Sequence, residues 1–260
     1  MISIKSKTEL ETMSRACEIV AISLKLIEEA VKPGVTTKEL DTIAEKYILS
    51  QNATPTFKGV KCAIRGGIDF PSAVCTSVNN EVIHGIPGLR ELKDGDIISV
   101  DIGACYGGFH GDAARTFPVG KVSEETLRLI KVTEQSFYEG IRNAVKGNRI
   151  VDISRAIQQY VEQNGFSVVR DYVGHGIGRE LWEPPQIPNY ATRERGPRLD
   201  PGMTIAVEPM VNQGGFEVKP LDNKWTVVTA DGKLSAHYEN TIAITDDEPF
   251  IMTKLRGEGF

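Results

Sequence analysis

Residues 92–117 read LKDGDIISVDIGACYGGFHGDAARTF, and a second stretch, LDPGMTIAVE at residues 199–208, repeats the first part of this pattern. Both contain Leu-x-x-Gly-x-x-Ile-x-Val followed by an acid, so five positions match at a constant offset of 107 residues. The apolar runs IISV and TIAV are typical of buried strands, and we place Asp101 and Glu208 where these strands end. Matched strands so far apart predict a chain built from two similar halves.

The segments around these strands give both halves the same order of elements. Two helices with apolar residues every three or four positions come first, and short strands follow. Capping residues and Gly, Pro or Asn set the expected helix boundaries. These run from Ser6 to Pro33-Gly34, from Thr36 to Gln51-Asn52, and from Ser123 through Val145 to Gly147-Asn148, with a shorter helix around Ile153 and Ile157 that ends at Asn164-Gly165. We therefore expect one α+β domain over residues 1–260, with pseudo-repeats at roughly 6–119 and 123–245.

The composition is that of an ordinary globular protein and excludes several other classes. The 260 residues are 40% apolar and 25% charged, which excludes a disordered chain and a disulfide-stapled one. A formal net charge of -5 argues against broad binding of DNA or RNA. The N-terminal segment carries charges and no apolar run, so we expect neither a signal peptide nor a membrane anchor. The four cysteines form no CxxC pair, which favours a reducing, cytoplasmic compartment, and one compact domain favours a monomer.

Four acids stand in strand contexts where a solvated carboxylate is unexpected. Asp101 and Glu208 follow apolar strands, and each half supplies one more acid, Asp112 in HGDAART and Glu239 in HYENT. Burying an unpaired charge costs several kcal/mol or shifts its pKa until it is neutral. One such acid alone could be a structural residue satisfied by its neighbours, but two matched pairs favour a metal site.

The charges and donor types of this set indicate two divalent cations. The four acids total -4, and His175 in the second of two His-Gly-Ile segments adds a nitrogen ligand. Two cations about 3.5 Å apart that share carboxylates can activate a water and polarise a carbonyl. An oxygen-rich set with one imidazole suits manganese, iron or cobalt, and zinc is also compatible.

At this point the sequence resembles the type I methionine aminopeptidases of the pita-bread metallopeptidase superfamily. The resemblance extends from the first helix to about Ile244. It is carried by NNEVIHGIPG, DGDIISVDIGACYGGFHGDAARTF, VGHGIGRELWEPPQIPNY, LDPGMTIAVEPM and SAHYENTI. The resemblance implies a pseudo-twofold fold in which an antiparallel sheet is covered by two pairs of helices.

The resemblance also implies a role for each motif residue. Asp112 and Glu239 would bridge two metal ions, Asp101 would hold one ion, and His175 with Glu208 would complete the other. Glu208 would also accept a proton. His84 would hydrogen-bond the substrate near the scissile amide, although a buried histidine satisfied by backbone is the alternative.

Three further residues fall where the family lines its methionine pocket. Cys75, Trp225 and Phe70 would contact the methionine side chain, although a tryptophan at this position could equally belong to the core. We expect His110 and His237, which neighbour ligand acids, to play structural or supporting roles outside the ligand set.

Two positions depart from the family pattern. Trp182 stands where the family normally has a histidine that contacts the scissile carbonyl, and an indole offers one N–H donor but no titratable nitrogen. The segment VKCAIRGGID at residues 60–69 is longer than the usual tight turn beside the pocket. We therefore expect an altered catalytic contact at Trp182 and altered substrate access beside the pocket.

Three functions are compatible with these residues. The leading one is removal of the initiator methionine from nascent chains whose second residue is small, with N-terminal methionyl peptides and the ribosome as partners. A proline-directed aminopeptidase of the same superfamily is the second, although such relatives usually carry an extra N-terminal domain. The third is a weakly active or inactive paralogue that binds peptides or ribosomes, which Trp182 suggests and the intact acid set opposes.

Overall fold

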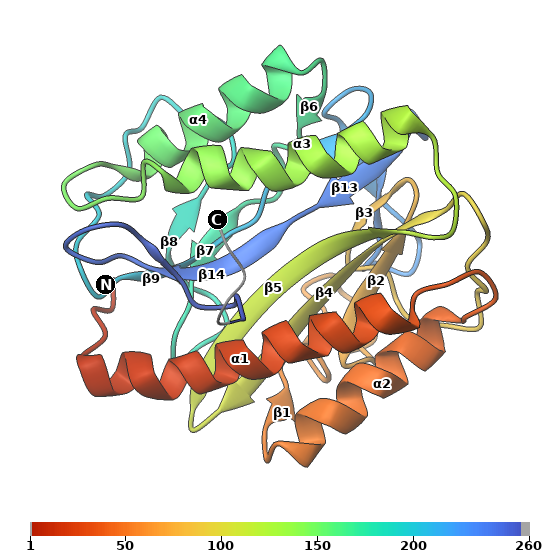
Figure 1. Ribbon diagram of the computed structural model, residues 1–260, viewed down its shortest axis with the longest axis horizontal. Helices are drawn as coiled ribbons and strands as arrows, with labels where there is room; N and C mark the ends of the chain where they lie inside the picture. Colours follow the sequence, from red (N-terminus) through yellow and green to blue (C-terminus); the bar gives the residue numbers. More distant parts are fainter. Residues whose placement is uncertain (1, 256–260) are drawn as a thin grey trace.

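The computed structural model describes residues 2–255 and consists of four helices and a set of mostly short strands (Figure 1). The helices are α1 (Lys7–Ala30), α2 (Thr37–Ser50), α3 (Glu124–Ile141) and α4 (Ile150–Gln163). The strands of the first half are β1 (Thr54–Pro55), β2 (Val74–Val78), β3 (Glu81–Ile83), β4 (Ile97–Tyr106) and β5 (Phe109–Pro118). Those of the second half are β6 (Ser167–Val168), β7 (Gly174–Gly176), β8 (Glu183–Ile187), β9 (Thr204–Val207), β10 (Met210–Asn212), β11 (Val218–Pro220), β12 (Val227–Thr229), β13 (Ser235–His237), β14 (Glu239–Ala243) and β15 (Phe250–Ile251). The expected helix–helix–strands order in each half is confirmed.

The helix starts lie where the capping residues predicted them. The hydroxyl of Ser6 accepts from the Glu9 amide at the start of α1, and Glu9 accepts in return from the Ser6 amide. Thr36 and Glu39 form the same reciprocal pair at α2. These local bonds satisfy amides that the first turn of a helix leaves without partners, which is why the sequence alone could locate them.

The end of α3 differs from the prediction. The helix stops at Ile141, so Val145 lies beyond it in the connection to α4. The amide of Asn143 bonds the carbonyl of Gly140, and that of Ala144 bonds Ile141, so contacts three residues apart replace the helical spacing of four. The prediction that this helix continues to Gly147-Asn148 was wrong.

One large antiparallel sheet joins the two halves. Its nine strands include the path β1-β4-β5-β14-β9-β7-β8, while β2 pairs with β4 and β15 with β14. The central contact between β5 and β14 pairs Ala114 with Glu239, so strands from opposite halves become neighbours. Two three-stranded sheets, β13-β10-β6 and β11-β12-β3, complete the strand layer.

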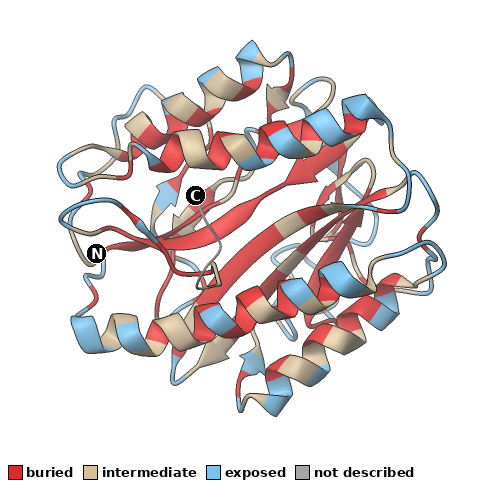
Figure 2. Cartoon of the chain, viewed as in Figure 1, coloured by how far each residue is buried: buried red, intermediate tan, exposed pale blue. Residues whose placement is uncertain are grey.

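The helices form two pairs that cover the same side of the sheet (Figure 1). Helices α1 and α2 contact strands of the first half, and α3 and α4 contact strands of the second. The expectation of an antiparallel sheet covered by two helix pairs is therefore confirmed. Buried residues line the strands and the sheet-facing sides of the helices (Figure 2). Within residues 2–255 no helix combines the length and the apolar character that crossing a membrane requires.

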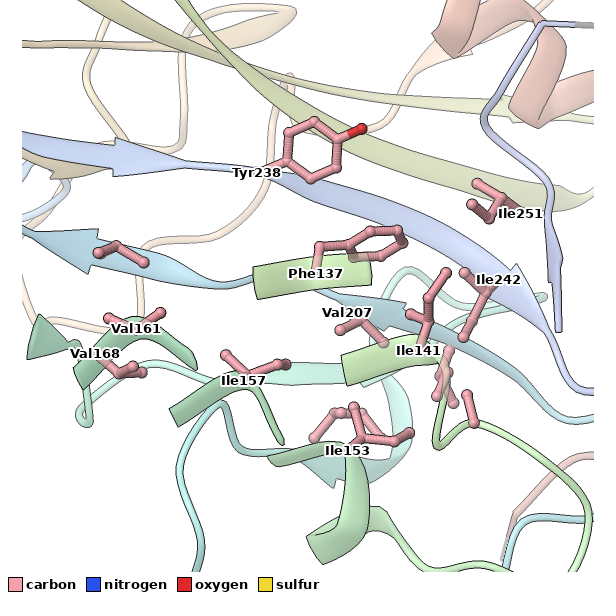
Figure 3. Packing of buried hydrophobic residues seen from close by; sticks show 14 of the residues in the cluster. Phe137, Ile141, Ile153, Ile157, Val161, Val168, Val207, Tyr238, Ile242 and Ile251 are labelled. Carbon is pink, nitrogen blue, oxygen red and sulfur yellow. The ribbon is translucent and has the colours of Figure 1, made fainter. Parts of the chain in front are cut away.

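Each helix pair encloses its own apolar core. Beneath α3 and α4, Phe137, Ile153 and Ile157 pack with Val207 and Ile242 from the sheet (Figure 3). A separate cluster beneath α1 and α2 includes Ile27, Leu40 and Val100. Ala113 of β5 belongs to the core beneath α1 and α2, and Ile242 of β14 belongs to the core beneath α3 and α4, so each of these two neighbouring strands packs into a different core.

Candidate metal centre

Three side chains from three strands converge at the centre of the large sheet. Asp112 comes from β5, His175 from β7 and Glu239 from β14, and one donor atom of each lies within 4.8 Å of the others. Thr241 fixes the first of these strands, because its hydroxyl accepts from the Asp112 amide at 3.0 Å and donates to the Asp112 carbonyl at 2.9 Å. The convergence follows from the pairing of β5 with β14.

The two remaining predicted ligands lie against this group. His175 Nε2 is 3.7 Å from Glu208 Oε1 and 3.9 Å from Asp112 Oδ2. Asp101 lies close enough to Asp112 that each carboxyl affects the pKa of the other. The structure thus brings together all five residues that the sequence proposed as ligands.

One detail of the strand prediction was wrong. Glu208 directly follows β9 as expected, but Asp101 lies in the middle of β4, which continues to Tyr106. The strand does not end at the acid because it is paired on both sides there, with Cys75 of β2 and Ala114 of β5 opposite Asp101. Ladder hydrogen bonds therefore carry the strand past the polar residue.

Burial dominates the electrostatics of the four acids. It raises the pKa of Asp101 to about 7 and raises the pKa of Asp112, Glu208 and Glu239 well above the usual carboxyl range. Repulsion among the acids adds to the effect at Asp112 and Glu239. The four carboxyls cannot all be ionised at neutral pH unless positive charge is placed among them.

The buried oxygens of this cluster have the properties of metal ligands. Asp101 Oδ1, Asp112 Oδ1 and Glu239 Oε1 are buried without a hydrogen-bond partner, which is unusual for carboxylate oxygens in a protein interior. Nδ1 of His175 lies 2.9 Å from the carbonyl of Gly176, and a proton donated there leaves the Nε2 lone pair facing the acids. Burial lowers the pKa of His175, which favours this neutral form. The residues present therefore fit divalent cations.

The predicted substrate residues form a second group beside the acids. The rings of Phe70 and Trp225 meet edge to face with centroids 5.2 Å apart, and Cys75 lies in the same apolar cluster. His84 has a left-handed backbone (φ 57°), and its ring packs edge-on against Trp225 at 6.3 Å and Tyr172 at 6.0 Å. Burial lowers the pKa of His84 to about 4, so its imidazole is neutral at physiological pH.

The two departures from the family pattern lie on the surface. Trp182 is 58% exposed and directly precedes β8, whose Glu183 pairs with Gly176 next to His175. The 60–69 segment is tied to the pocket by two bonds: Trp225 Nε1 donates to the carbonyl of Ile68, and Lys224 Nζ donates to that of Arg65. The longer segment therefore flanks the tryptophan of the predicted pocket.

Sequence reasoning missed three residues that support the site. Arg115 donates to the carbonyl of Glu239 and to Asn240 Oδ1, Thr241 holds β5 as described above, and Tyr172 contacts His84. The spacing of Thr241 from Glu239 offered a signal, because residues two apart on a strand share a face. Arg115 and Tyr172 gave no such signal, since their contacts depend on chain segments far away in the sequence.

A large cavity elsewhere in the described chain does not coincide with this centre. It measures about 1200 Å³ and lies beside α3, where Arg115, Tyr138 and Lys254 line it. Neither His175 nor any of the four acids lines this cavity. The chemistry of the converging groups, and not cavity volume, marks the candidate site.

Comparison with known proteins gives consistent matches over nearly the whole chain. Residues 11–246 match the model of metallopeptidase family M24. The methionine aminopeptidase of Clostridium perfringens is 56% identical over 98% of this chain and 100% of its own length, and methionine aminopeptidase 1 of Bacillus subtilis is 52% identical over 98% and 100%.

The solved structures agree with the sequence matches. The methionine aminopeptidase of Thermotoga maritima superposes with a TM-score of 0.92 at 44% identity, covering 98% of this chain and 100% of that one. The Xaa-Pro dipeptidase of Bacillus anthracis superposes with a TM-score of 0.76 at 22% identity, covering 98% of this chain and 63% of that one. The second match shows a shared fold only.

Proposed function

Because the chain belongs to metallopeptidase family M24, we propose that it removes N-terminal methionine from nascent polypeptides whose second residue is small. It is a metal-dependent aminopeptidase, since methionine aminopeptidases are 52 to 56% identical to it over nearly their full lengths. The observation that carries the proposal is the convergence of Asp112, His175 and Glu239 donor atoms within 4.8 Å in a buried site. A hydrolase of this family needs such a donor set for its metal.

The five converging residues would hold two divalent cations, which could be cobalt, manganese, iron or zinc. Asp112 and Glu239 would contact both ions, Asp101 would hold one of them, and His175 with Glu208 would hold the other. When bound, such ions supply Lewis acidity that polarises the scissile carbonyl and lowers the pKa of an attacking water. Charge supports the count, because four ionised carboxylates balance two divalent ions.

The pocket formed by Phe70, Cys75 and Trp225 would bind the methionine side chain. A thioether is polarizable and packs well against aromatic rings, and the edge-to-face pair of Phe70 and Trp225 offers two such surfaces. A pocket of this kind discriminates against a missing or added methylene by only about 1 to 3 kcal/mol. Leucine should therefore be cleaved slowly, whereas a charged first residue should be excluded.

Two side chains would act directly on the reacting groups. His84 is partly buried and neutral, so it can donate one hydrogen bond to the substrate without bringing a charge that must be desolvated. Glu208 would accept a proton from the attacking water and deliver it to the leaving amine. Its carboxyl oxygen Oε1 lies 3.7 Å from His175 Nε2, so this acid belongs to the group that would hold the metal and its water.

The alternatives have weaker support. Solved proline-specific relatives such as the Bacillus anthracis dipeptidase are 22% identical or less, compared with 44% for the Thermotoga aminopeptidase. An inactive peptide-binding paralogue would have no need to keep five converging residues that are suited to bind metal. Trp182 alone motivates that alternative.

We extend the proposal to the context of the reaction. The substrates would be nascent chains in the cytoplasm, met at or near the ribosome, and residues 1–260 would act as one monomeric catalytic domain. A single domain is supported by the ligand set, because Asp101 and Asp112 come from one half of the chain and the other three ligands from the second half.

Metal-titrated hydrolysis of matched tripeptides tests the proposal. The metal-free protein is incubated with Met-Ala-Ser, Met-Lys-Ser and Leu-Ala-Ser while Mn²⁺ or Co²⁺ is increased, and released amino acids are quantified. We expect rapid metal-dependent release of methionine from Met-Ala-Ser, slow release from Leu-Ala-Ser and none from Met-Lys-Ser. Equal cleavage of all three, or cleavage that a chelator does not affect, would contradict the proposal.

A further inference from the structure

His237 carries a buried ring nitrogen that the functions proposed so far do not use. The residue is 2% exposed, and its Nε2 has no hydrogen-bond partner among the described residues. The nearest acid is Glu239, whose Oε2 lies 3.8 Å away. A buried polar atom without a partner is costly, so its retention needs an explanation.

The backbone holds this imidazole in a fixed place. Thr116 on β5 accepts a hydrogen bond from the His237 amide at 2.8 Å, and its hydroxyl donates to the His237 carbonyl at 2.9 Å. This two-bond clamp ties the end of β13 to the strand that carries Asp112. The ring of His237 is thus set beside Glu239 by the same strand that positions another ligand.

The geometry favours a supporting role for His237 over direct binding of the metal. Among residues 2–255, the donor atoms that converge within 4.8 Å come from Asp112, His175 and Glu239, and the nitrogens of His237 do not join them. Glu239 has one oxygen, Oε1, buried without a partner and the other, Oε2, facing His237. His237 therefore faces the proposed ligand Glu239 but does not belong to the group of converging donor atoms.

We propose that His237 is a positioning residue: its Nε2–H donates to Glu239 Oε2 and so directs Glu239 Oε1 toward a divalent cation. The proposal rests on the proposed function in one respect, that Glu239 binds a metal. Closing the gap from 3.8 Å to an ordinary N–H···O length of about 2.9 Å needs a movement of about 1 Å. Hydrogen bonds to a ligating carboxylate fix its orientation, and their loss typically lowers metal affinity about 10- to 100-fold.

Metal titration of two substitutions at this position tests the role. His237→Phe keeps an aromatic ring and removes both nitrogens, whereas His237→Gln keeps an N–H donor of similar reach. His110→Phe is the matched control, because His110 lies two residues from the ligand Asp112 and its Nδ1 lies 3.1 Å from the Thr56 hydroxyl instead of facing a carboxylate. Calorimetry with Mn²⁺ on each metal-free protein gives the dissociation constant and the number of ions bound.

We expect His237→Phe to bind the same number of ions as the wild type with a dissociation constant raised about 10- to 100-fold. His237→Gln and His110→Phe should stay within about threefold of the wild type. An unchanged constant in His237→Phe overturns the proposal, and loss of one ion overturns it in favour of direct ligation. Melting of the metal-free variants shows whether the fold is intact. A wild-type protein that binds no Mn²⁺ contradicts the proposed function itself, which is a separate outcome.

Discussion

Metal binding should release protons in a pH-dependent way, and the raised pKa of Asp101 sets the scale. Burial raises the pKa of this carboxyl from 3.8 to about 7, so at pH 6 about nine-tenths of the metal-free molecules carry a proton on Asp101. A cation can use this oxygen only after that proton leaves. At pH 8 the same carboxyl is about nine-tenths ionised and contributes almost no release.

The direction and size of the pH dependence follow from the competition between protons and metal ions for the same carboxyl oxygens. Because Asp112, Glu208 and Glu239 also have raised pKa values, they add protons to the release in the same direction. The lowered pKa of His175 reduces the number of protons that this residue adds to the release. Each released proton weakens the apparent metal affinity about tenfold for each pH unit below the pKa of the group. Affinity for Mn²⁺ should therefore fall steeply from pH 8 to pH 6.

Calorimetry in two buffers with different ionisation enthalpies measures the number of protons released. We expect at least about one proton per protein at pH 6, and fewer at pH 8. Asp101→Asn keeps the shape of the side chain and cannot ionise, so it should release about one proton fewer at pH 6. Binding at pH 6 with no proton release, or an affinity that rises as pH falls, would refute the electrostatic account.

Three further changes have defined outcomes. Asp112→Ala should abolish detectable turnover and lower the number of tightly bound ions, because loss of a shared ligand leaves two cations repelling each other. If calorimetry still counts two tightly bound ions in this variant, Asp112 does not bridge them. Trp182→His should raise kcat on the order of 100-fold with little change in KM if the exposed indole leaves the scissile carbonyl without a donor, and steady-state kinetics with unchanged or lower kcat would mark Trp182 as a tolerated substitution. Added Mn²⁺ should raise the melting temperature of the metal-free protein in a concentration-dependent way, because the folded cluster binds it and the unfolded chain does not; identical scanning-calorimetry traces with and without chelator would argue against clustered acids.

The parts of the fold that local chemistry determines could be predicted from the sequence. Ser6 and Thr36 cap their helices through bonds within three residues, and the prediction of those starts was accurate. The end of α3 could not be found in this way. The last turn of α3 packs closely on α4: a Cβ added to Gly140 would be 2.6 Å from Ile157 Cγ1. The pattern of residues along α3 does not predict such a contact with another helix.

The difference between local and long-range contacts also explains which parts of the site could be predicted. The offset of 107 residues identified β4 and β9 as matched strands. Both belong to one sheet, in which β5 and β14 lie between them, and this order makes the acids converge. The extent of β4 was missed because partners on both sides carry a strand past a polar residue such as Asp101. Arg115 was missed because its contact with Glu239 spans 124 residues, and only the pairing of β5 with β14 creates it.

Anomalous X-ray diffraction from crystals soaked in Mn²⁺ tests the central claim most directly. The account predicts two strong manganese peaks among Asp101, Asp112, His175, Glu208 and Glu239, with Asp112 and Glu239 contacting both. Peaks at another place in the molecule, or a manganese site that none of these carboxylates contacts, would contradict it.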